Sequence, residues 1–244
     1  MIYKIGLLGA SGRMGQEVAA LLAEDPKVGT DSFELADGIT QSGRMTSLDG
    51  VSLRTVGEPA REPVHVWIDF SRPEATIALL ETAGTPVVIC TTGFTPAQRA
   101  RVETYAQKHA VLMAANTSPG MQWFTRALEK APSLAGLGFS AVLSEDHHIH
   151  KKDSPSGTAK RILESLKKQG FENVEVQVTR AGSIVGTHTV RFIADGEEIT
   201  LTHRATDRRI FARGALLAAR FLLQQKKPGL YSFEDVSFDL GDSK

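Results

Sequence analysis

A glycine-rich loop near the start of the chain constrains the possible folds more than any other feature of the sequence. Residues 2–8 form a short apolar run that is typical of a buried strand, and apolar residues recur at helical spacing over 14–22. Between them, residues 9–15 carry three glycines in the spacing G-x-x-G-x-x-G. In a strand–loop–helix unit, such glycines let the pyrophosphate of a dinucleotide approach the backbone N–H groups at the helix start. The loop therefore predicts nucleotide binding, with a merely tight turn as the alternative.

The remainder of the first half repeats this alternation of strands and helices. Strands are expected at 33–37, 64–70, 86–90 and 110–115. Helices are expected at 73–80 and 96–109, each opened by a proline, which suits the first helical turn. The segment 38–63 is weakly patterned and is expected to be rich in loops. Alternating strands and helices predict right-handed βαβ units around a parallel sheet, which is an α/β fold.

The second half has a different pattern, so a domain change is expected near Ser118. Strands are expected at 139–145, 174–180, 184–193 and 198–204, with a helix at 156–169. The pair Asp195 and Gly196 predicts a hairpin turn between the last two strands. This order is an α+β pattern with an antiparallel component. A final helix at 210–225 is compatible with either domain.

Composition and charge exclude several classes of protein. Of the 244 residues, 28 are Lys or Arg and 28 are Asp or Glu, so the formal net charge is zero. This balance gives no support to nucleic-acid or membrane-surface binding. The single cysteine, Cys90, excludes an intrachain disulfide. No apolar stretch approaches the roughly 18–20 residues of a membrane span, and the apolar N-terminus is too short for a signal peptide, so a soluble cytoplasmic protein is expected.

A segment rich in histidine and lysine, residues 145–159, joins an expected strand to an expected helix. His147, His148 and His150 lie within it, and Lys151 follows directly. Histidine exchanges protons near neutral pH, and a lysine beside it adds a charged donor. The helix start offers backbone N–H groups and hydroxyls that bind carboxylates, at Ser156, Gly157 and Thr158. The segment therefore predicts a site for a small carboxylate anion beside a proton donor.

Two other interpretations of this segment are open. A metal site is one, but the neighbouring lysines oppose a cation, and the sequence has no second cluster of His or Cys to complete a coordination set. No metal is therefore expected. A solvated polar loop without a ligand is the other. Elsewhere, His188 and His203 lie in expected strands and are interpreted as structural, and Trp67 is interpreted as a core residue.

Several ordered motifs resemble those of one enzyme family. The most specific is E-x-H-H-x-x-K-x-D-x-P-S-G-T-A, which residues 145–159 fit throughout. Lesser matches follow the family's order at 9–15, 69–74, 91–94 and 114–118, and R-x-G-x-I-x-G-x-H is matched at 180–188. On these motifs, the chain resembles the 4-hydroxy-tetrahydrodipicolinate reductase family, also called dihydrodipicolinate reductase, over nearly its whole length.

The resemblance implies a fold, an assembly and a reaction. The fold is a Rossmann-like parallel-sheet nucleotide domain, expected over 1–118 and 213–244, with a smaller α+β mixed-sheet domain over 119–212. The smaller domain binds substrate and builds a homotetramer. The reaction is reduction of 4-hydroxy-tetrahydrodipicolinate, a cyclic imine dicarboxylate, by NADH or NADPH in the diaminopimelate route to lysine.

The resemblance also implies roles for residues at matching positions. His147 and Lys151 match the catalytic positions, with His147 a proton donor or acceptor and Lys151 a proton donor. His148, Gly157 and Thr158 match substrate-binding positions, which Ser156 joins as the neighbouring residue at the helix start. The expected cofactor contacts are Gly9, Ala10, Ser11, Gly12, Arg13, Met14, Cys90, Thr91, Thr92, Ala114, Ala115, Asn116 and Thr117.

Departures from the family pattern leave the choice between NADH and NADPH open. Cys90 stands where many members have glycine, and Ile39 or Thr40 falls near the place of the acid that binds the adenosine ribose. Glu34 and Asp37 lie near the spacing such an acid requires, about 20 residues after the loop. Arg13 and Arg44 would instead attract a 2′-phosphate, so use of both cofactors is expected.

Two further functions share the glycine loop. One is another two-domain dehydrogenase, acting on an amino acid or a semialdehyde. A semialdehyde enzyme needs a nucleophilic cysteine, and Cys90 ends an expected strand beside the cofactor instead. The other is a nucleotide sensor without catalysis, for which a proton donor has no use.

Overall fold

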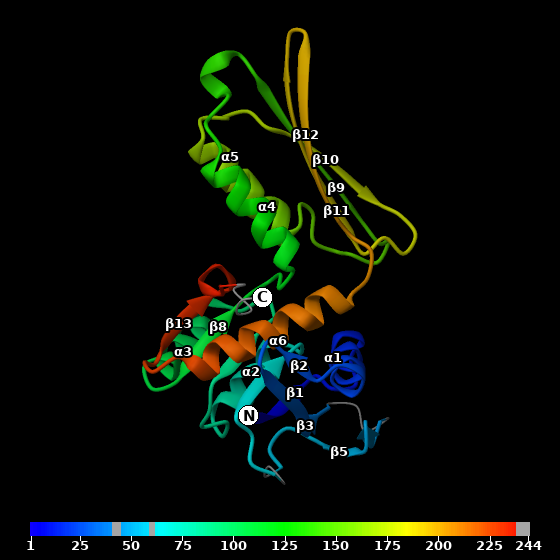
Figure 1. Ribbon diagram of the computed structural model, residues 1–244, viewed down its shortest axis with the longest axis vertical. Helices are drawn as coiled ribbons and strands as arrows, with labels where there is room; N and C mark the ends of the chain where they lie inside the picture. The colour runs from blue at the N-terminus through cyan, green and yellow to red at the C-terminus, as the bar shows by residue number, and fades with distance from the viewer. Residues whose placement is uncertain (41–44, 59–61, 238–244) are drawn as a thin grey trace. The chain divides into compact units, whose positions relative to one another are not determined.

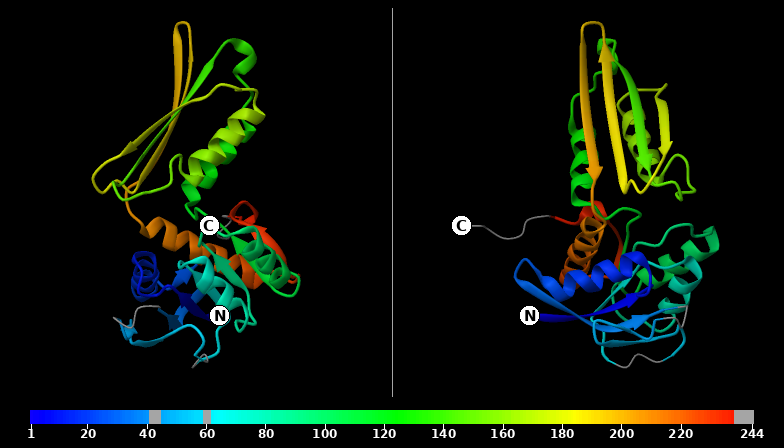
Figure 2. Two further views of the ribbon diagram at one scale, coloured as in Figure 1. Left: turned by 180° about the vertical axis from the view of Figure 1, so that it is seen from behind. Right: turned by 90° about the vertical axis from the view of Figure 1, so that its right-hand side faces the viewer.

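The structure is a computed structural model that describes the chain except residues 41–44, 59–61 and 238–244. It divides into two compact units (Figures 1 and 2). Unit 1 comprises Met1–Thr117 and Arg209–Lys244, and unit 2 comprises Ser118–Arg208. In the described part of the chain, no helix is long and apolar enough to cross a membrane.

Unit 1 is built on a sheet in which most neighbouring strands are parallel. The strand order is β13-β8-β7-β6-β1-β3-β5-β4, and β2 pairs with β3 outside this path. Every pair from β13 to β5 is parallel, while β2 and β4 add short antiparallel pairs. The strands are β1 (Ile2–Leu8), β2 (Lys27–Val28), β3 (Asp31–Ile39), β4 (Ser47–Leu48), β5 (Val51–Arg54), β6 (Val66–Asp69), β7 (Val87–Ile89), β8 (Ala110–Met113) and β13 (Gly229–Ser232).

Helices cover both faces of this sheet. They are α1 (Arg13–Glu24), α2 (Pro73–Leu80), α3 (Pro96–Ala106), α6 (Arg209–Gln224) and the 3-10 turn η2 (Phe233–Asp235). Helices α1 and α6 contribute to one hydrophobic core, and α2 and α3 contribute to a second. Strand β6 serves both, since Val66 and Ile68 belong to the first core and Trp67 to the second, as alternation along a strand requires. The prediction that Trp67 is a core residue is confirmed.

Several short strands of unit 1 were not specified by the sequence pattern. The segment 38–63, expected to be rich in loops, contains β4 and β5, and β5 pairs in parallel with the end of β3. Strand β13 lies beside β8 at the opposite edge of the sheet. These three strands are only two to four residues long, too short to show a period. Helix α6, left open between two domains, belongs to unit 1.

Unit 2 packs helices against a four-stranded mixed sheet in the order β10-β9-β11-β12. Strand β10 runs parallel to β9, whereas β11 is antiparallel to both β9 and β12. The pair Ala194↔Glu197 encloses Asp195 and Gly196, which confirms the predicted hairpin turn. The elements are α4 (Pro119–Lys130), η1 (Ala135–Leu137), β9 (Ser140–His147), α5 (Gly157–Lys168), β10 (Glu175–Arg180), β11 (Gly186–Ala194) and β12 (Glu197–Ala205).

Helix α4 has no counterpart in the sequence expectation, although its start carries a signal. The Ser118 hydroxyl caps the helix by accepting a hydrogen bond from the Met121 N–H at 3.2 Å, and Pro119 occupies the first turn. Met121, Phe124 and Leu128 recur at helical spacing and enter the core of unit 2. The Ser-Pro pair therefore marks a helix start as well as the domain change.

Close packing at Gly214 in α6 gives a test of the unit 1 fold. Helix propensity alone predicts that Gly214→Ala stabilises the protein by roughly 1 kcal/mol. However, a Cβ at this position would overlap the carbonyl oxygen of Thr117. We expect the overlap to dominate, so that Gly214→Ala lowers the free energy of unfolding by about 1–3 kcal/mol, measured by denaturant titration. Gly136→Ala is the control, because open space surrounds Gly136, and a stabilised Gly214→Ala variant would contradict the packing.

Candidate functional site

The glycine loop of unit 1 joins β1 to α1 in a conformation that only small residues allow. Gly9 has a φ of 84°, and a Cβ there would also collide with the Phe70 carbonyl. A Cβ at Gly15 would collide with the backbone oxygens of Gly9 and Ala10. Gly12 is the N-cap of α1 and offers no side-chain oxygen to the first N–H groups of the helix. The helix start is therefore shaped for an external anion such as a phosphate.

A cavity of about 300 Å³ lies beside this loop, at the carboxyl ends of β1, β3 and β6. Open parallel α/β sheets bind ligands at this edge. Strands β7 and β8 continue the same edge, because they are the next parallel neighbours of β6. The predicted cofactor residues at the ends of β7 and β8 therefore fall along it, at Cys90, Thr91, Thr92, Ala114, Ala115, Asn116 and Thr117. The remaining ones, residues 9–14, form the loop and the first turn of α1.

The candidate acids for ribose recognition do not lie at this cavity. Asp37 is 2% exposed, and its two carboxylate oxygens accept hydrogen bonds from the Arg54 Nε at 3.0 and 2.8 Å. Glu34 lies on β3 outside the residues that line the cavity. Thr40 does line it, and its hydroxyl lies 2.5 Å from that of Ser11. Both carboxylate oxygens of Asp37 are thus paired with Arg54, and neither of the two acids at the expected spacing lines the cavity. Arg44, the second arginine proposed for a 2′-phosphate, lies outside the described residues.

A buried aspartate organises the loops along the same edge. Asp69, at the end of β6, is 0% exposed and accepts hydrogen bonds from the Ser71 N–H, the Ser71 hydroxyl, and the hydroxyls of Thr76 and Thr91, at 2.9, 2.5, 2.5 and 2.9 Å. Burial raises the pKa of Asp69, and these hydrogen bonds oppose that rise. The carboxyl group thus ties the loop after β6 to the loop after β7.

The single cysteine adjoins this network, and its surroundings disfavour the thiolate. Burial, together with the charge of Asp69, raises the pKa of the Cys90 thiol well above its usual value. A thiol that stays protonated cannot form the thioester on which a semialdehyde dehydrogenase depends.

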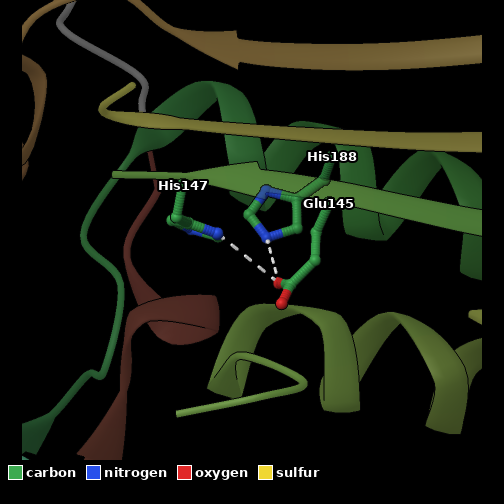
Figure 3. Close-up of side chains that lie close together, drawn as sticks. All are labelled: Glu145, His147 and His188. Atoms are coloured by element: carbon green, nitrogen blue, oxygen red, sulfur yellow. Dashed lines mark ion pairs between the residues drawn. The ribbon is translucent and has the colours of Figure 1, made fainter. Parts of the chain in front are cut away.

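Unit 2 gathers Glu145, His147 and His188 into one buried cluster (Figure 3). Glu145 and His147 are two residues apart on β9, so they face the same side of the sheet. The antiparallel register places His188 of β11 opposite Glu145, and the parallel register places Arg180 of β10 opposite His147. The sheet pairing therefore brings together residues that lie up to 43 positions apart.

The Glu145 carboxylate is the centre of this cluster. It is 0% exposed, and its Oε1 accepts hydrogen bonds from Arg180 Nη2 at 2.7 Å and from the Ser156 N–H at 3.0 Å. Its Oε2 lies 3.5 Å from His188 Nε2 and 3.7 Å from His147 Nδ1. Burial raises the pKa of Glu145, but hydrogen bonds from His188, Ser156 and Arg180 outweigh it and hold the pKa far below the usual value. The group is therefore a carboxylate at every physiological pH.

The environment of His147 keeps its imidazole neutral. Burial lowers its pKa to about 4; the charges of His188, Lys151 and Arg180 act in the same direction, and Glu145 opposes them. The rings of His147 and His188 lie edge to face with their centroids 5.1 Å apart. The sequence pattern indicated a structural role for His188 and did not predict that it lies beside His147. It also indicated no role for Glu145 or Arg180. The R-x-G-x-I-x-G-x-H stretch, which contains Arg180 and His188, was the available signal.

Lys151 is held at the start of α5. Its Nζ lies 2.8 Å from Asp153 Oδ1, and its backbone N–H donates to the His148 carbonyl at 3.0 Å. Burial raises the pKa of Asp153, while the hydrogen bond and charge of Lys151 and the backbone of Gly157 lower it, with a net lowering. The ammonium of Lys151 and the backbone of Gly157 thus converge on one carboxylate, as a carboxylate-binding site requires.

Ser156 has a different place from the other predicted substrate residues. It is 2% exposed, and its hydroxyl caps α5 by accepting a hydrogen bond from the Ala159 N–H at 3.1 Å. Its own N–H is bonded to Glu145. Gly157 is exposed and Thr158 is partly exposed in the first turn of α5. Gly157 and Thr158 are therefore the accessible part of this turn and Ser156 is its buried part, and the substrate-binding roles of all three stay predictions.

The buried cluster also offers the donor set of a metal site. Glu145, His147 and His188 each present one ligand atom, and these atoms lie within 4.8 Å of one another. Two imidazoles and a carboxylate suit Zn²⁺. Against this, the guanidinium of Arg180 lies 2.7 Å from the same carboxylate and already supplies its positive partner. The cluster therefore fits an internal ion pair better than a cation site, and the expected absence of a metal stays a prediction.

Comparisons with known protein families match nearly the whole chain to one of them. The family model for the N-terminus of dihydrodipicolinate reductase matches residues 3–117, and the model for its C-terminus matches residues 120–236. A 4-hydroxy-tetrahydrodipicolinate reductase of Lawsonia intracellularis is 34% identical, over 97% of this chain and 100% of its own length. The corresponding protein of Stenotrophomonas maltophilia is 40% identical, over 93% of this chain and 95% of its own length.

Solved structures share the fold. A dipicolinate-bound dihydrodipicolinate reductase of a Paenisporosarcina species aligns with a TM-score of 0.68 at 21% identity, covering 97% of this chain and 100% of that one. An engineered D-amino acid dehydrogenase bound to NADP⁺ aligns with a TM-score of 0.57 at 14% identity, covering 100% of this chain and 97% of that one.

Proposed function

The chain belongs to the dihydrodipicolinate reductase family, and from this we infer that it reduces 4-hydroxy-tetrahydrodipicolinate to tetrahydrodipicolinate with NADH or NADPH. This is a step of the diaminopimelate route of lysine biosynthesis. The observation that carries the inference is the segment 145–159, in which a buried histidine, a lysine and a helix start lie together. A nucleotide sensor would have no use for this proton-transfer chemistry.

The two units divide the chemistry. In unit 1, the glycine loop and the strand ends beside it would hold the nicotinamide cofactor, which would supply a hydride when bound. In unit 2, Gly157 and Thr158 at the start of α5 bind one substrate carboxylate. The substrate loses its 4-hydroxyl as water, the resulting conjugated imine accepts the hydride at C4, and the enamine that forms takes up one proton.

The residues of unit 2 donate and accept the protons in this reaction. Lys151 carries the positive charge that attracts the dianionic substrate, and its ammonium donates a proton as electrons move toward the ring. His147 is neutral, so it accepts or relays a proton rather than holding one in advance. Asp153 keeps the ammonium of Lys151 beside the helix start, 2.8 Å from its own carboxylate.

Lys151 gives the sharpest test of this mechanism. We expect Lys151→Ala to lower kcat by about 10²–10⁴-fold, the usual contribution of a general acid, and to raise the KM for the substrate. Affinity for NADPH should persist, because the cofactor is held by unit 1. The rates are measured as NADPH oxidation with freshly condensed substrate. Lys152→Ala is the matched control, since Lys152 is exposed and should change little. If both variants lose the same fraction of kcat, Lys151 contributes only general electrostatic attraction and is not the proton donor.

Both nicotinamide cofactors should support the reaction. Thr40 stands near the place of a ribose-binding acid, and Asp37 is paired with Arg54, so among the described residues no carboxylate lines the cavity to bind a 2′-hydroxyl, whereas Arg13 of the loop is available to a 2′-phosphate. Parallel titrations should give values of kcat/KM that differ by less than about 100-fold, or roughly 2.7 kcal/mol. Thr40→Asp should move the ratio toward NADH, because a carboxylate binds the 2′-hydroxyl and repels a 2′-phosphate. A larger preference in the natural protein would defeat this prediction.

We expect a homotetramer built through the sheet of unit 2. Its outer strands carry exposed apolar side chains, with Val178 of β10 and Ile199 of β12 at 38% and 40% exposure. Small sheets with such edges are normally covered. The number four comes from the family. Light scattering at micromolar concentration checks it, and a monomeric mass would refute it. We place this enzyme in the cytoplasm, since its one cysteine stays a free thiol.

A further inference from the structure

The carboxylate of Glu145 contacts both parts of the proposed substrate site. Its Oε1 accepts a hydrogen bond from the Ser156 N–H, directly before α5, at 3.0 Å. Its Oε2 lies 3.7 Å from Nδ1 of His147, on the strand that leads to Lys151. One fully buried side chain therefore connects the proton-transfer histidine to the helix start that binds the carboxylate.

Two residues from neighbouring strands prevent this carboxylate from turning. Arg180 Nη2 donates to Glu145 Oε1 and to the Asp153 carbonyl, both at 2.7 Å. His188 Nε2 lies 3.5 Å from Glu145 Oε2 and 3.3 Å from the Ser156 hydroxyl. Arg180 thereby also fixes the loop that carries Lys151, because Asp153 belongs to that loop.

The other side of the His147 ring is defined by Gly186. A Cβ at Gly186 would approach the ring of His147 to 3.2 Å, closer than ordinary contact. The ring thus lies between a glycine of β11 and the carboxylate of Glu145. Arg180, Gly186 and His188 all come from residues 180–188, so this stretch supports the segment that carries the chemistry.

We infer that Glu145 is a positioning residue of the reductase: held by Arg180 and His188, it fixes the His147 ring and the start of α5 relative to each other. The inference rests on the proposed function. A carboxylate opposite Nδ1 favours the tautomer of His147 that carries its hydrogen on Nδ1. The lone pair is then on Nε2, which exchanges the proton, and the same contact keeps the helix start in register with it.

The test compares Glu145→Gln with Glu198→Gln. Glutamine keeps the shape of Glu145 and removes its charge. Glu198 forms an exposed ion pair with Arg191 in the same sheet, at 2.6 Å, so Glu198→Gln makes the same chemical change away from the site. For Glu145→Gln we expect kcat to fall about 10- to 100-fold, as when the group orienting a functional histidine is lost, and the KM for the substrate to rise. The KM for NADPH should stay unchanged, and Glu198→Gln should alter none of these values.

Nuclear magnetic resonance of the His147 ring nitrogens supplies a readout that loss of packing would not mimic. We expect the Nδ1–H tautomer in the natural protein and a shift toward the Nε2–H tautomer in Glu145→Gln. A natural protein in the Nε2–H tautomer overturns the inference whether or not the variant folds. A folded Glu145→Gln enzyme with kcat within about threefold of the natural protein overturns it as well. If the natural protein binds NADPH but does not turn over the substrate, the proposed function fails, and the tautomer still tests the role of Glu145.

Discussion

A buried negative charge determines how unit 2 is arranged. A carboxylate without solvent contact is costly unless ionic partners and hydrogen bonds surround it. Glu145 finds these partners on separate elements: Arg180 on β10, His188 on β11 and the N–H of Ser156 before α5. These contacts exist only if β9 pairs with both neighbours in the observed register and α5 starts where it does. The same carboxylate therefore constrains the fold of the unit and the geometry of its site.

Unit 1 also contains a buried carboxyl group, but its pKa shifts in the opposite direction. Asp69 is equally buried at the end of β6, but its partners are hydroxyl and amide groups rather than cations. Without a cation to offset burial, the pKa of Asp69 rises, whereas that of Glu145 falls. Asp69 thus serves to tie two loops along this edge of the sheet.

The sequence predicted the features that depend on local pattern. The glycine loop, the buried strands of the parallel sheet and the hairpin at Asp195 and Gly196 follow from spacing and turn chemistry over a few residues. The fold class and the family were likewise correct. The short strands β5 and β13 escaped because two to four residues show no period, and they form only because β3 and β8 offer them a partner. Helix α4 was a different case, since its Ser-Pro start was visible but was interpreted only as a domain junction.

The site was predicted less completely, for a physical reason. His147 and Lys151 stand in one segment and could be found together, but the residues around them depend on strand register. His188 reaches Glu145 only because β11 pairs antiparallel with β9, and one residue of slip would turn it to the other face. Asp37 shows the same dependence on register: its spacing suits a ribose ligand, but Arg54 comes to it from the neighbouring strand β5.

Electrostatics then separates the roles of the two catalytic candidates. With a pKa of about 4, His147 is unprotonated at neutral pH, so the standing acid of the proposed mechanism is Lys151. A dianionic substrate changes that balance, because added negative charge favours the protonated form of a nearby imidazole. His147 therefore becomes a better base when substrate is bound and loses its proton more readily when the substrate leaves. A low pKa in the free protein thus suits a group that relays a proton during turnover, and burial of the ring, aided by the charges of His188, Lys151 and Arg180, is what lowers that pKa.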